Sequence, residues 1–452
     1  MKNRLAIYLS VLAMAFVALS CSYDDDEALS PYAYIKTFSL GDIKSSYPEF
    51  TEDGKDTLVV KTLSGSSFPF TINQLTGEIF NADSLPFSTN LTKIVMNITV
   101  EGVVTIYDEA TAKFEELLTT DSVDCTFPRT LKVTSLDGDY SKEYTVSVNA
   151  HKLNPDLLVW SDVETPAGIV PEKAIEFGGN MLLLGKSSAV PSFVSMPLNG
   201  ASSWAPYTMT GIPATADFTT ATIYKGALYT LADGNLYMSA DAVSWECVQQ
   251  GNDLVAIIGA SDEHGYIWLA NAGNIYRSAD GKTLETVEAL PGNFPLYGIS
   301  ASSGVMAHNK NIVRYMLVGY PTSAKDTAPQ VWSMLSTENG WVKYENVDNP
   351  YPCPSLAGLT VLRYDNFLYA FGGKGTAGGE QVEAFASFYI SKDNGIVWKA
   401  PEGFYQLLPK ALKNNDVPFV ATVDSNKYMW IITADENVGA WRGIINRLGF
   451  KK

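Results

Sequence analysis

One octapeptide gives the strongest indication of the architecture of this chain, Ser391-Lys392-Asp393-Asn394-Gly395-Ile396-Val397-Trp398. Ser and Asp side chains bond to the backbone of a tight turn, and Gly and Asn tolerate a positive φ there. A Trp directly after the turn offers a large ring for packing between sheets. The pattern predicts a β-hairpin in which Ser391, Asp393, Gly395 and Trp398 have structural roles.

Weaker copies of this turn recur along the C-terminal two-thirds of the chain. Ser239-Ala240-Asp241 precedes Trp245, Ser278-Ala279-Asp280-Gly281 precedes Leu284, and a third copy starts at Ser336 and ends at Trp341. With Trp204 closing a first unit, the equivalent positions are 204, 245, 284, 341 and 398. Such spacing fits the roughly 40 to 50 residues of a β-propeller blade, with insertions in the longer units. Asp241, Trp245 and Asp280 are therefore interpreted as structural.

A sixth unit fits after residue 409, with strands around 419–423, 428–433 and 443–449. This unit lacks an outermost strand. The apolar segment Leu157-Leu158-Val159-Trp160-Ser161, left over at the start of the domain, can supply that strand and join the two ends of the ring. The sequence predicts a six-bladed β-propeller over 155–452, closed by this N-terminal strand.

Residues 31–153 differ in composition, since all nine Trp lie beyond Pro155. The segments 58–61, 94–100, 131–133 and 144–148 are rich in β-branched residues and often alternate, as half-buried antiparallel strands do. The segment 108–118 could form a helical turn or a hairpin, and a hairpin is favoured. We expect an all-β chain with a β-sandwich over 31–153, joined to the propeller by the short connector 151–155.

The first 21 residues are typical of an export signal. Lys2 and Arg4 precede an apolar run over 5–19, which is too short for a typical spanning helix, and Ser20 precedes Cys21. An uncleaved membrane anchor is the alternative. Residues 22–30, which begin Ser-Tyr-Asp-Asp-Asp-Glu, are expected to form an acidic tether.

The segment Ala18-Leu19-Ser20-Cys21 resembles a bacterial lipobox, although Ala18 stands where Leu is typical. The resemblance implies that Cys21 is acylated and that the protein is held at the outer membrane by its lipid anchor. The acidic run that follows looks like the export signal of Bacteroidetes surface lipoproteins, which implies display on the cell exterior. A periplasmic lipoprotein remains the alternative.

Other segments resemble known modules. The octapeptide matches the Asp-box pattern S-x-D-x-G-x-x-W, 367–373 resembles the strand and Gly-Gly doublet of kelch blades, and 135–149 resembles the last strands of immunoglobulin-like or cadherin-like sandwiches. With the terminal segment 441–448, the chain looks like a group of uncharacterised Bacteroidetes surface lipoproteins. This resemblance implies no established activity.

Composition narrows the possible partners. The net charge of −17 repels nucleic acid on average, while 46% hydrophobic and 18% charged residues allow a large core. Beyond Cys21, the chain has Cys125, Cys247 and Cys353, whose odd number and wide spacing support neither a disulfide framework nor a zinc site. We expect small buried thiols, no cofactor, and membrane contact through the lipid anchor alone.

Enzymes on similar propellers are poorly matched. Sialidases bind a substrate carboxylate with three arginines, and no Phe-Arg-Ile-Pro segment of that kind occurs here. Galactose oxidase holds copper with two His, whereas His264 and His308 lie in polar turns and are expected to be solvated. Hydrolysis by a carboxylate pair remains open, because sequence spacing does not report the gap between two carboxylates.

Long loops indicate where a ligand would bind. The second-to-third strand connections 320–330, 372–383 and 434–440 and the blade crossings 349–355 and 401–417 are expected on one face. Their aromatic residues Tyr320, Tyr351, Phe404 and Tyr405 can stack on a sugar or anchor a protein, or fold back as packing residues. The favoured function is binding or adhesion to a glycan or an envelope protein. The alternatives are a glycoside-processing enzyme and a structural component of an outer-membrane assembly.

Overall fold

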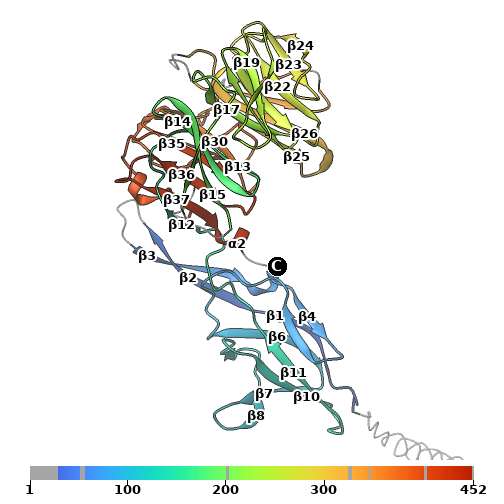
Figure 1. Cartoon of the computed structure of the whole chain (residues 1–452). Coiled ribbons are helices and arrows are strands. Elements are labelled where there is room, and N and C mark those ends of the chain that lie inside the picture. The colour runs from blue at the N-terminus through green and yellow to red at the C-terminus, as the bar shows by residue number, and fades with distance from the viewer. Residues whose placement is uncertain are drawn as a thin grey trace, which may run out of the picture. The chain divides into compact units, whose positions relative to one another are not determined.

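The computed structural model describes residues 29–50, 56–199, 203–323, 328–338, 340–345, 348–401 and 405–449. The predicted all-β class is confirmed, since the described elements are strands apart from short helical turns. The chain divides into two compact units between Asn154 and Pro155 (Figure 1). The export signal, Cys21 and most of the acidic tether lie outside the described residues. Among the described residues, no helix has the length and apolar character to cross a bilayer.

The first unit packs its two larger sheets over a shared core. Ile35 and Ile94 from one sheet and Leu131 and Tyr144 from the other belong to one buried cluster. The sheets are β1 (Tyr34–Leu40), β6 (Ile94–Glu101) and β9 (Ser122–Val123), then β4 (Phe70–Asn73), β5 (Glu78–Asn81), β11 (Ser141–Ser147), β10 (Arg129–Thr134), β7 (Val103–Asp108) and β8 (Lys113–Glu116), and the pair β2 (Asp42–Phe50) and β3 (Asp56–Ser64).

Two local predictions for this unit agree with the structure. Tyr144, Val146 and Val148 are buried on one face of β11 and its extension. The predicted hairpin over 108–118 is confirmed, because β7 pairs with β8 in antiparallel register around Asp108 and Lys113. The parallel pairing of β5 with β11 was not predicted.

Six sheets form the blades of the second unit in the described residues. In blade order they are β13 (Val170–Phe177), β14 (Asn180–Ser187), β15 (Val190–Pro197) and β16 (Ala205–Thr208); β17 (Asp217–Tyr224), β18 (Ala227–Ala232), β19 (Asn235–Ser239) and β20 (Glu246–Gln249); β21 (Ala256–Ser261), β22 (Tyr266–Ala270), β23 (Asn274–Ser278) and β24 (Glu285–Ala289); β25 (Tyr297–Met306), β26 (Asn309–Tyr320), β27 (Gln330–Leu335) and β28 (Val342–Lys343); β30 (Thr360–Tyr364), β31 (Phe367–Phe371) and β34 (Tyr389–Ser391); and β35 (Phe419–Val423), β36 (Met429–Thr433), β37 (Ala440–Ile445) and β12 (Leu158–Val163).

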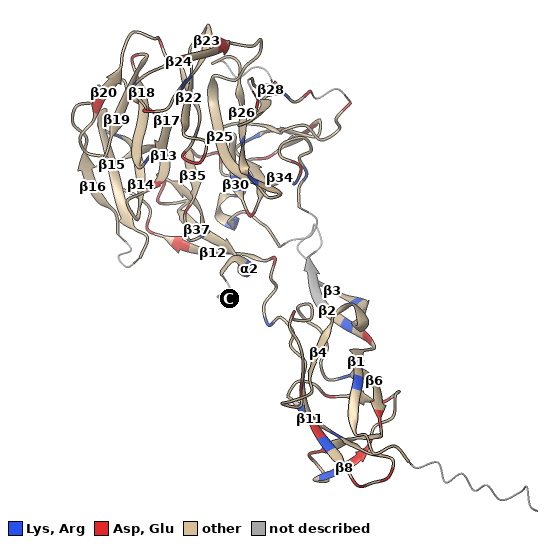
Figure 2. Ribbon diagram, turned by 90° about the vertical axis from the view of Figure 1, so that its right-hand side faces the viewer, with Lys and Arg blue, Asp and Glu red and all other residues tan. Residues whose placement is uncertain are grey.

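The first strands of the blades close a ring. β13 lies beside β17, β17 beside β21, β21 beside β25, β25 beside β30, β30 beside β35, and β35 beside β13. The last blade is completed by β12, which pairs with β37 (Figure 2) so that Trp160 lies opposite Gly443. The six-bladed propeller with an N-terminal closing strand is therefore confirmed.

One detail of the strand prediction is wrong. The final strand covers Ala440–Ile445 instead of 443–449, because residues Asn446–Gly449 turn into the short helix α2, whose Arg447 bonds to Asp156 and Asp365. In the fifth blade, the fourth strand is reduced to a single bridge between Ile390 and Lys399. A separate three-stranded sheet lies in its connections, made of β29 (Ser355–Leu356), β32 (Gly375–Ala377) and β33 (Glu380–Val382).

The Ser-x-Asp turns join the third and fourth positions of the blades. In the turn that starts at Ser391, the Ser391 hydroxyl donates to Asp393 at 2.7 Å, and Asp393 Oδ1 accepts the N–H groups of Ile396 and Val397. Trp398 Nε1 donates to Gly395 O at 2.9 Å, and its ring is buried with residues of the preceding blade. Asp241 and Asp280 accept backbone N–H groups in the same way.

The three described cysteines are free thiols. Cys125 and Cys353 are buried, as expected, while Cys247 is partly exposed. Burial raises the pKa of Cys125 to about 12, and burial also raises the pKa of Cys353. These two thiols are protonated and act as small apolar core residues.

Candidate functional site

Strand direction gives the propeller two faces. The first strand of each blade begins where the chain crosses from the preceding blade, and the second-to-third connections end on that same side, which we call the crossing face. The Ser-x-Asp turns lie on the opposite side, which we call the turn face. The long connections that follow β26, β31 and β36 leave these strands on the crossing face.

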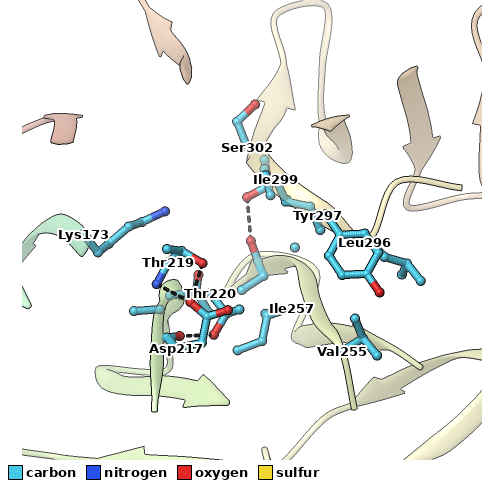
Figure 3. Close-up of a pocket in the computed structure, with 17 residues that line it drawn as sticks. Lys173, Asp217, Thr219, Thr220, Val255, Ile257, Leu296, Tyr297, Ile299 and Ser302 are labelled. Atoms are coloured by element: carbon cyan, nitrogen blue, oxygen red, sulfur yellow. Dashed lines mark hydrogen bonds between the residues drawn. The ribbon is translucent and has the colours of Figure 1, made fainter. Parts of the chain in front are cut away.

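A cavity of about 400 Å³ lies where the first strands converge on the propeller axis (Figure 3). We call it the axial pocket. It is lined by residues from β13, β17, β21 and β25 and from the segments that lead into them, so it lies toward the crossing face. Its polar side chains come from Lys173, Asp217, Thr219, Thr220, Thr222, Tyr297, Ser302 and Ser303.

Lys173 is the cation of the axial pocket. Its side chain extends from β13 into the space between the strands (Figure 3). In the part of the chain that the structure describes, no carboxylate lies within 4.0 Å of its ammonium. Burial lowers the pKa of Lys173, and the charge of Asp217 opposes this shift only in part. The ammonium is therefore a strong donor whose desolvation is incompletely compensated.

Asp217 and two threonines form the opposite wall. Asp217 Oδ1 accepts from the Thr219 N–H at 3.0 Å and from the Thr219 hydroxyl at 2.5 Å, while the Thr220 hydroxyl donates to Asp217 O at 2.7 Å. The pairing of β17 with β18 shifts register between Asp217 and Thr222. A bulge of this kind re-aims side chains, which explains how consecutive threonines line one pocket.

β25 contributes the remaining hydroxyls. Ser303 donates to Ala260 O at 2.6 Å, so its hydroxyl is engaged, and Ser302 lies beside the cavity (Figure 3). Tyr297, which is 36% exposed, stands at the start of the strand. The pocket thus combines one ammonium, one carboxylate, several hydroxyls and one accessible aromatic ring. Small polar ligands with many hydroxyl groups match such a set of donors and acceptors.

A second hollow, the lateral groove, has a volume of about 500 Å³ and lies between the fifth and sixth blades. Its lining includes Lys392, Lys399, Tyr405 and Gln406, and the Tyr369 hydroxyl bonds to Gln406 at 3.0 Å. Because the turn that contains Lys392 borders it, this groove lies toward the turn face.

The four predicted ligand-binding aromatics do not gather in one place. Tyr320 is 3% exposed and its hydroxyl donates to Leu356 O, so its ring belongs to the core. Tyr351 is 42% exposed, with the Lys399 ammonium 4.3 Å from its ring centre. Tyr405 lines the lateral groove, and Phe404 lies outside the described residues. None of the three described aromatics lines the axial pocket.

Sequence reasoning missed the axial residues. Lys173 and Asp217 lie in short segments that mix polar and apolar residues, as many other strands of this chain do. One signal was available, since Lys173 shares its face of β13 with the apolar Ile175, and a propeller places this strand at its centre. The bulge that turns Thr219 and Thr220 toward the axis has no comparable sequence signal.

Metal chemistry has little support in the described residues, where no group of three or more His, Cys, Asp or Glu side chains could hold an ion. The expectation that His264 is solvated is wrong. Its Nδ1 lies 3.0 Å from the Tyr315 hydroxyl, and its ring packs near Trp268. Burial lowers the pKa of His264, so the neutral imidazole is a packing residue between the third and fourth blades.

Family models match both units. A model described as the DUF6242 beta propeller domain covers residues 154–452, and a model described as the N-terminal domain of the same family, of unknown function, covers residues 38–148. No curated protein sequence matches the chain.

Solved structures whose backbones follow a similar path have low sequence identity to this chain. A virginiamycin B lyase from Staphylococcus aureus is 12% identical, with 64% of this chain and 99% of that chain covered and a TM-score of 0.37. A family AA12 carbohydrate-active enzyme from Trichoderma reesei is 9% identical, with coverages of 64% and 95% and a TM-score of 0.38. An auxiliary nutrient binding protein from Bacteroides ovatus is 9% identical, with coverages of 78% and 94% and a TM-score of 0.36. At this similarity no property of these proteins is transferred to the chain.

Proposed function

The chain belongs to the DUF6242 family, and we propose that its propeller is a binding module for a glycan, held by the sugar hydroxyls in the axial pocket. The observation that carries the proposal is the Lys173 ammonium, which extends into an axial cavity with no carboxylate within 4.0 Å among the described residues. A ligand oxygen at this point would replace the hydrogen bonds that Lys173 loses on leaving water.

The chemistry of the opposite wall agrees with a sugar. Two hydrogen bonds from Thr219 hold the Asp217 carboxylate in place, so it can accept hydroxyl protons from a ligand without reorganising. Tyr297 at the rim offers an aromatic face for the apolar side of a sugar ring. The volume of about 400 Å³ suits one or two sugar residues.

Binding is favoured over hydrolysis by the number of carboxylates. Asp217 is the one acidic side chain among the described residues that line the axial pocket, whereas most glycoside hydrolases use two carboxyl groups that flank the scissile bond. A glycoside-processing enzyme and a structural component of an outer-membrane assembly are kept as outcomes of the test.

The experiment applies the full chain, purified in mild detergent, to a glycan array and measures affinity for each bound glycan by calorimetry. Lys173→Met is expected to lower affinity about tenfold, since a hydrogen bond to a charged group contributes roughly 1.5–3 kcal/mol. Lys282→Met removes the same charge from an exposed turn and is the matched control. An unchanged affinity in Lys173→Met, or no glycan bound, contradicts the axial site.

Two further variants test the aromatic predictions that remain, Tyr405→Ala in the lateral groove and Tyr351→Ala on the perimeter of the fifth blade. If these variants abolish binding while Lys173→Met does not, the ligand occupies the groove instead. Release of reducing ends from a polysaccharide panel supports an enzyme. Co-purification with an envelope protein without any glycan binding supports the structural role.

We also propose that Cys21 is lipidated and that the protein is anchored in the outer membrane with its propeller exposed. Metabolic labelling with an alkynyl fatty acid should mark the wild-type chain and not Cys21→Ser. Protease added to intact cells should then cleave the chain if it is displayed outside, and should spare it if it is periplasmic.

A further inference from the structure

Two arginines face each other across the junction between the fourth and fifth blades. Arg314 lies on β26 and Arg363 on β30. Side chains two residues apart on a strand share a face. Met316 and Val361, which stand two positions from these arginines, belong to the same buried cluster between the blades. Both guanidinium groups are therefore directed into that junction.

Arg363 is incompletely bonded. Its Nε and Nη2 atoms are buried and have no hydrogen-bond partner among the described residues. These two atoms lie on the edge of the guanidinium that can donate two parallel hydrogen bonds to one carboxylate. On the third blade, Arg277 uses the same edge to hold both carboxylate oxygens of Glu285, at 2.8 and 2.7 Å.

No described carboxylate compensates the two charges. Neither Arg314 nor Arg363 has an acidic oxygen within 4.0 Å, and Arg314 Nη1 instead bonds to the Tyr344 hydroxyl at 3.2 Å. Burial, and then the charge of Arg314, lower the pKa of Arg363. A guanidinium does not lose its proton in a protein, so a counterion would relieve this unfavourable charge.

We propose that a small monovalent anion, with chloride as the probe, binds between Arg314 and Arg363. A water molecule would accept the unpaired N–H groups, but it would leave two like charges facing each other in a poorly hydrated junction. A monoatomic anion accepts the unpaired N–H groups and also neutralises positive charge, and it needs the least room between packed blades.

The site is independent of the axial pocket. It uses β26 and β30, whereas the pocket is lined from β13, β17, β21 and β25. An anion that binds only the native ring raises its apparent stability by mass action. The bound ion would therefore link two neighbouring blades, and the expected readout is a halide-dependent melting temperature.

The test measures thermal unfolding of the full chain while sodium gluconate is replaced by sodium chloride at constant ionic strength. Wild type is expected to melt about 2 °C or more higher at 150 mM chloride than at 1 mM. Arg363→Met is expected to lose this difference. Arg277→Met removes an arginine that is paired with Glu285 and should keep it. Equal melting temperatures in wild type, or the same chloride response in Arg363→Met, overturn the proposal.

A measurement on the wild-type chain covers the case in which Arg363→Met does not fold. Crystals grown in sodium bromide should show an anomalous peak between the two guanidinium groups, within about 3.5 Å of Arg363 Nε or Nη2. Crystals with no peak there, at an occupancy that other bromide sites reach, also overturn the proposal. Arg314→Met should weaken the peak, since it removes half of the positive charge.

Discussion

Trp160 and Gly443 are partners across the two strands that close the propeller, and the indole of Trp160 covers the α-carbon of Gly443. A Cβ at Gly443 would lie 2.5 Å from Trp160 Cε3. The Trp160 Nε1 also donates to Leu407 O at 2.7 Å. The ring is thus closed by an aromatic side chain that requires a glycine opposite it.

Gly443→Ala is predicted to destabilise the chain by about 1–3 kcal/mol, because the methyl group forces the indole away from its position. The free energy of unfolding in urea measures the effect. Gly292→Ala is the matched control, since nothing lies within 4 Å of a Cβ at Gly292 and its φ is not positive, so this change should be neutral or slightly stabilising. Equal stabilities of the two variants would contradict the predicted contact.

Tyr364→Phe is predicted to weaken the contact between the fifth and sixth blades. The Tyr364 hydroxyl accepts the N–H of Ile445 at 3.0 Å in a buried site, so the variant leaves a buried donor unbonded at a cost of about 1–3 kcal/mol. Tyr351→Phe, at an exposed tyrosine, should change stability little. Denaturant unfolding of both variants checks the difference.

The same tyrosine gives a prediction for alkaline pH. Burial raises the pKa of Tyr364 to about 12, and Tyr224 and Tyr315 are raised to about 12 for the same reason. Their contribution to stability is therefore complete below pH 10 and is lost as pH rises toward 12. Wild type should lose more stability between pH 10 and 12 than Tyr364→Phe. A parallel decline of the two proteins would count against a buried, protonated Tyr364.

Asp280→Ala is predicted to loosen the turn of the third blade. Asp280 accepts the N–H groups of Lys282 and Thr283 at 2.8 and 2.7 Å, and these bonds hold the pKa of its carboxyl well below the ordinary range. A loss on the order of 1 kcal/mol is expected. Glu436→Ala, which removes an exposed carboxylate from a loop of the sixth blade, should be neutral.

The pH dependence of the Asp280 effect follows from its sign. A carboxyl whose native pKa is lowered contributes stability above its unfolded pKa, and this contribution is lost as pH falls through the native value. The stability difference between wild type and Asp280→Ala should be full at neutral pH and shrink in strong acid. Urea titrations at pH 7, 4 and 2.5 measure this trend, and a constant difference would contradict the turn bonds.

Lys173 should affect stability in the opposite pH range. Because burial lowers its native pKa below the ordinary value of 10.5, the unfolded chain binds the proton more tightly, and native stability rises with pH between the two values. Wild type should gain stability relative to Lys173→Met as pH increases from 7 to 10. Comparing the two proteins cancels the tyrosine contributions, and a flat difference would mean that Lys173 is hydrated.

Local sequence was sufficient for the repeating parts of this protein. The Ser391 turn and the alternation in β11 each depend on residues that are neighbours in the chain or on one strand. The hairpins and the individual strands therefore followed from short-range turn chemistry and two-residue periodicity. The closing strand followed instead from the open edge that the last blade would otherwise have. The shift of the last strand was missed because α2 depends on Arg447 and its two distant carboxylates.

Only the closed ring decided which side chains share a site. Lys173, Asp217 and Ser302 come from three different blades and meet because their first strands converge on one axis. The same closure brings Arg314 beside Arg363 and buries Tyr320. The alternation of residues along a strand determines which side chains point from each of its two faces. The residues that those side chains contact depend on the rotation from one blade to the next, which is a property of the assembled ring.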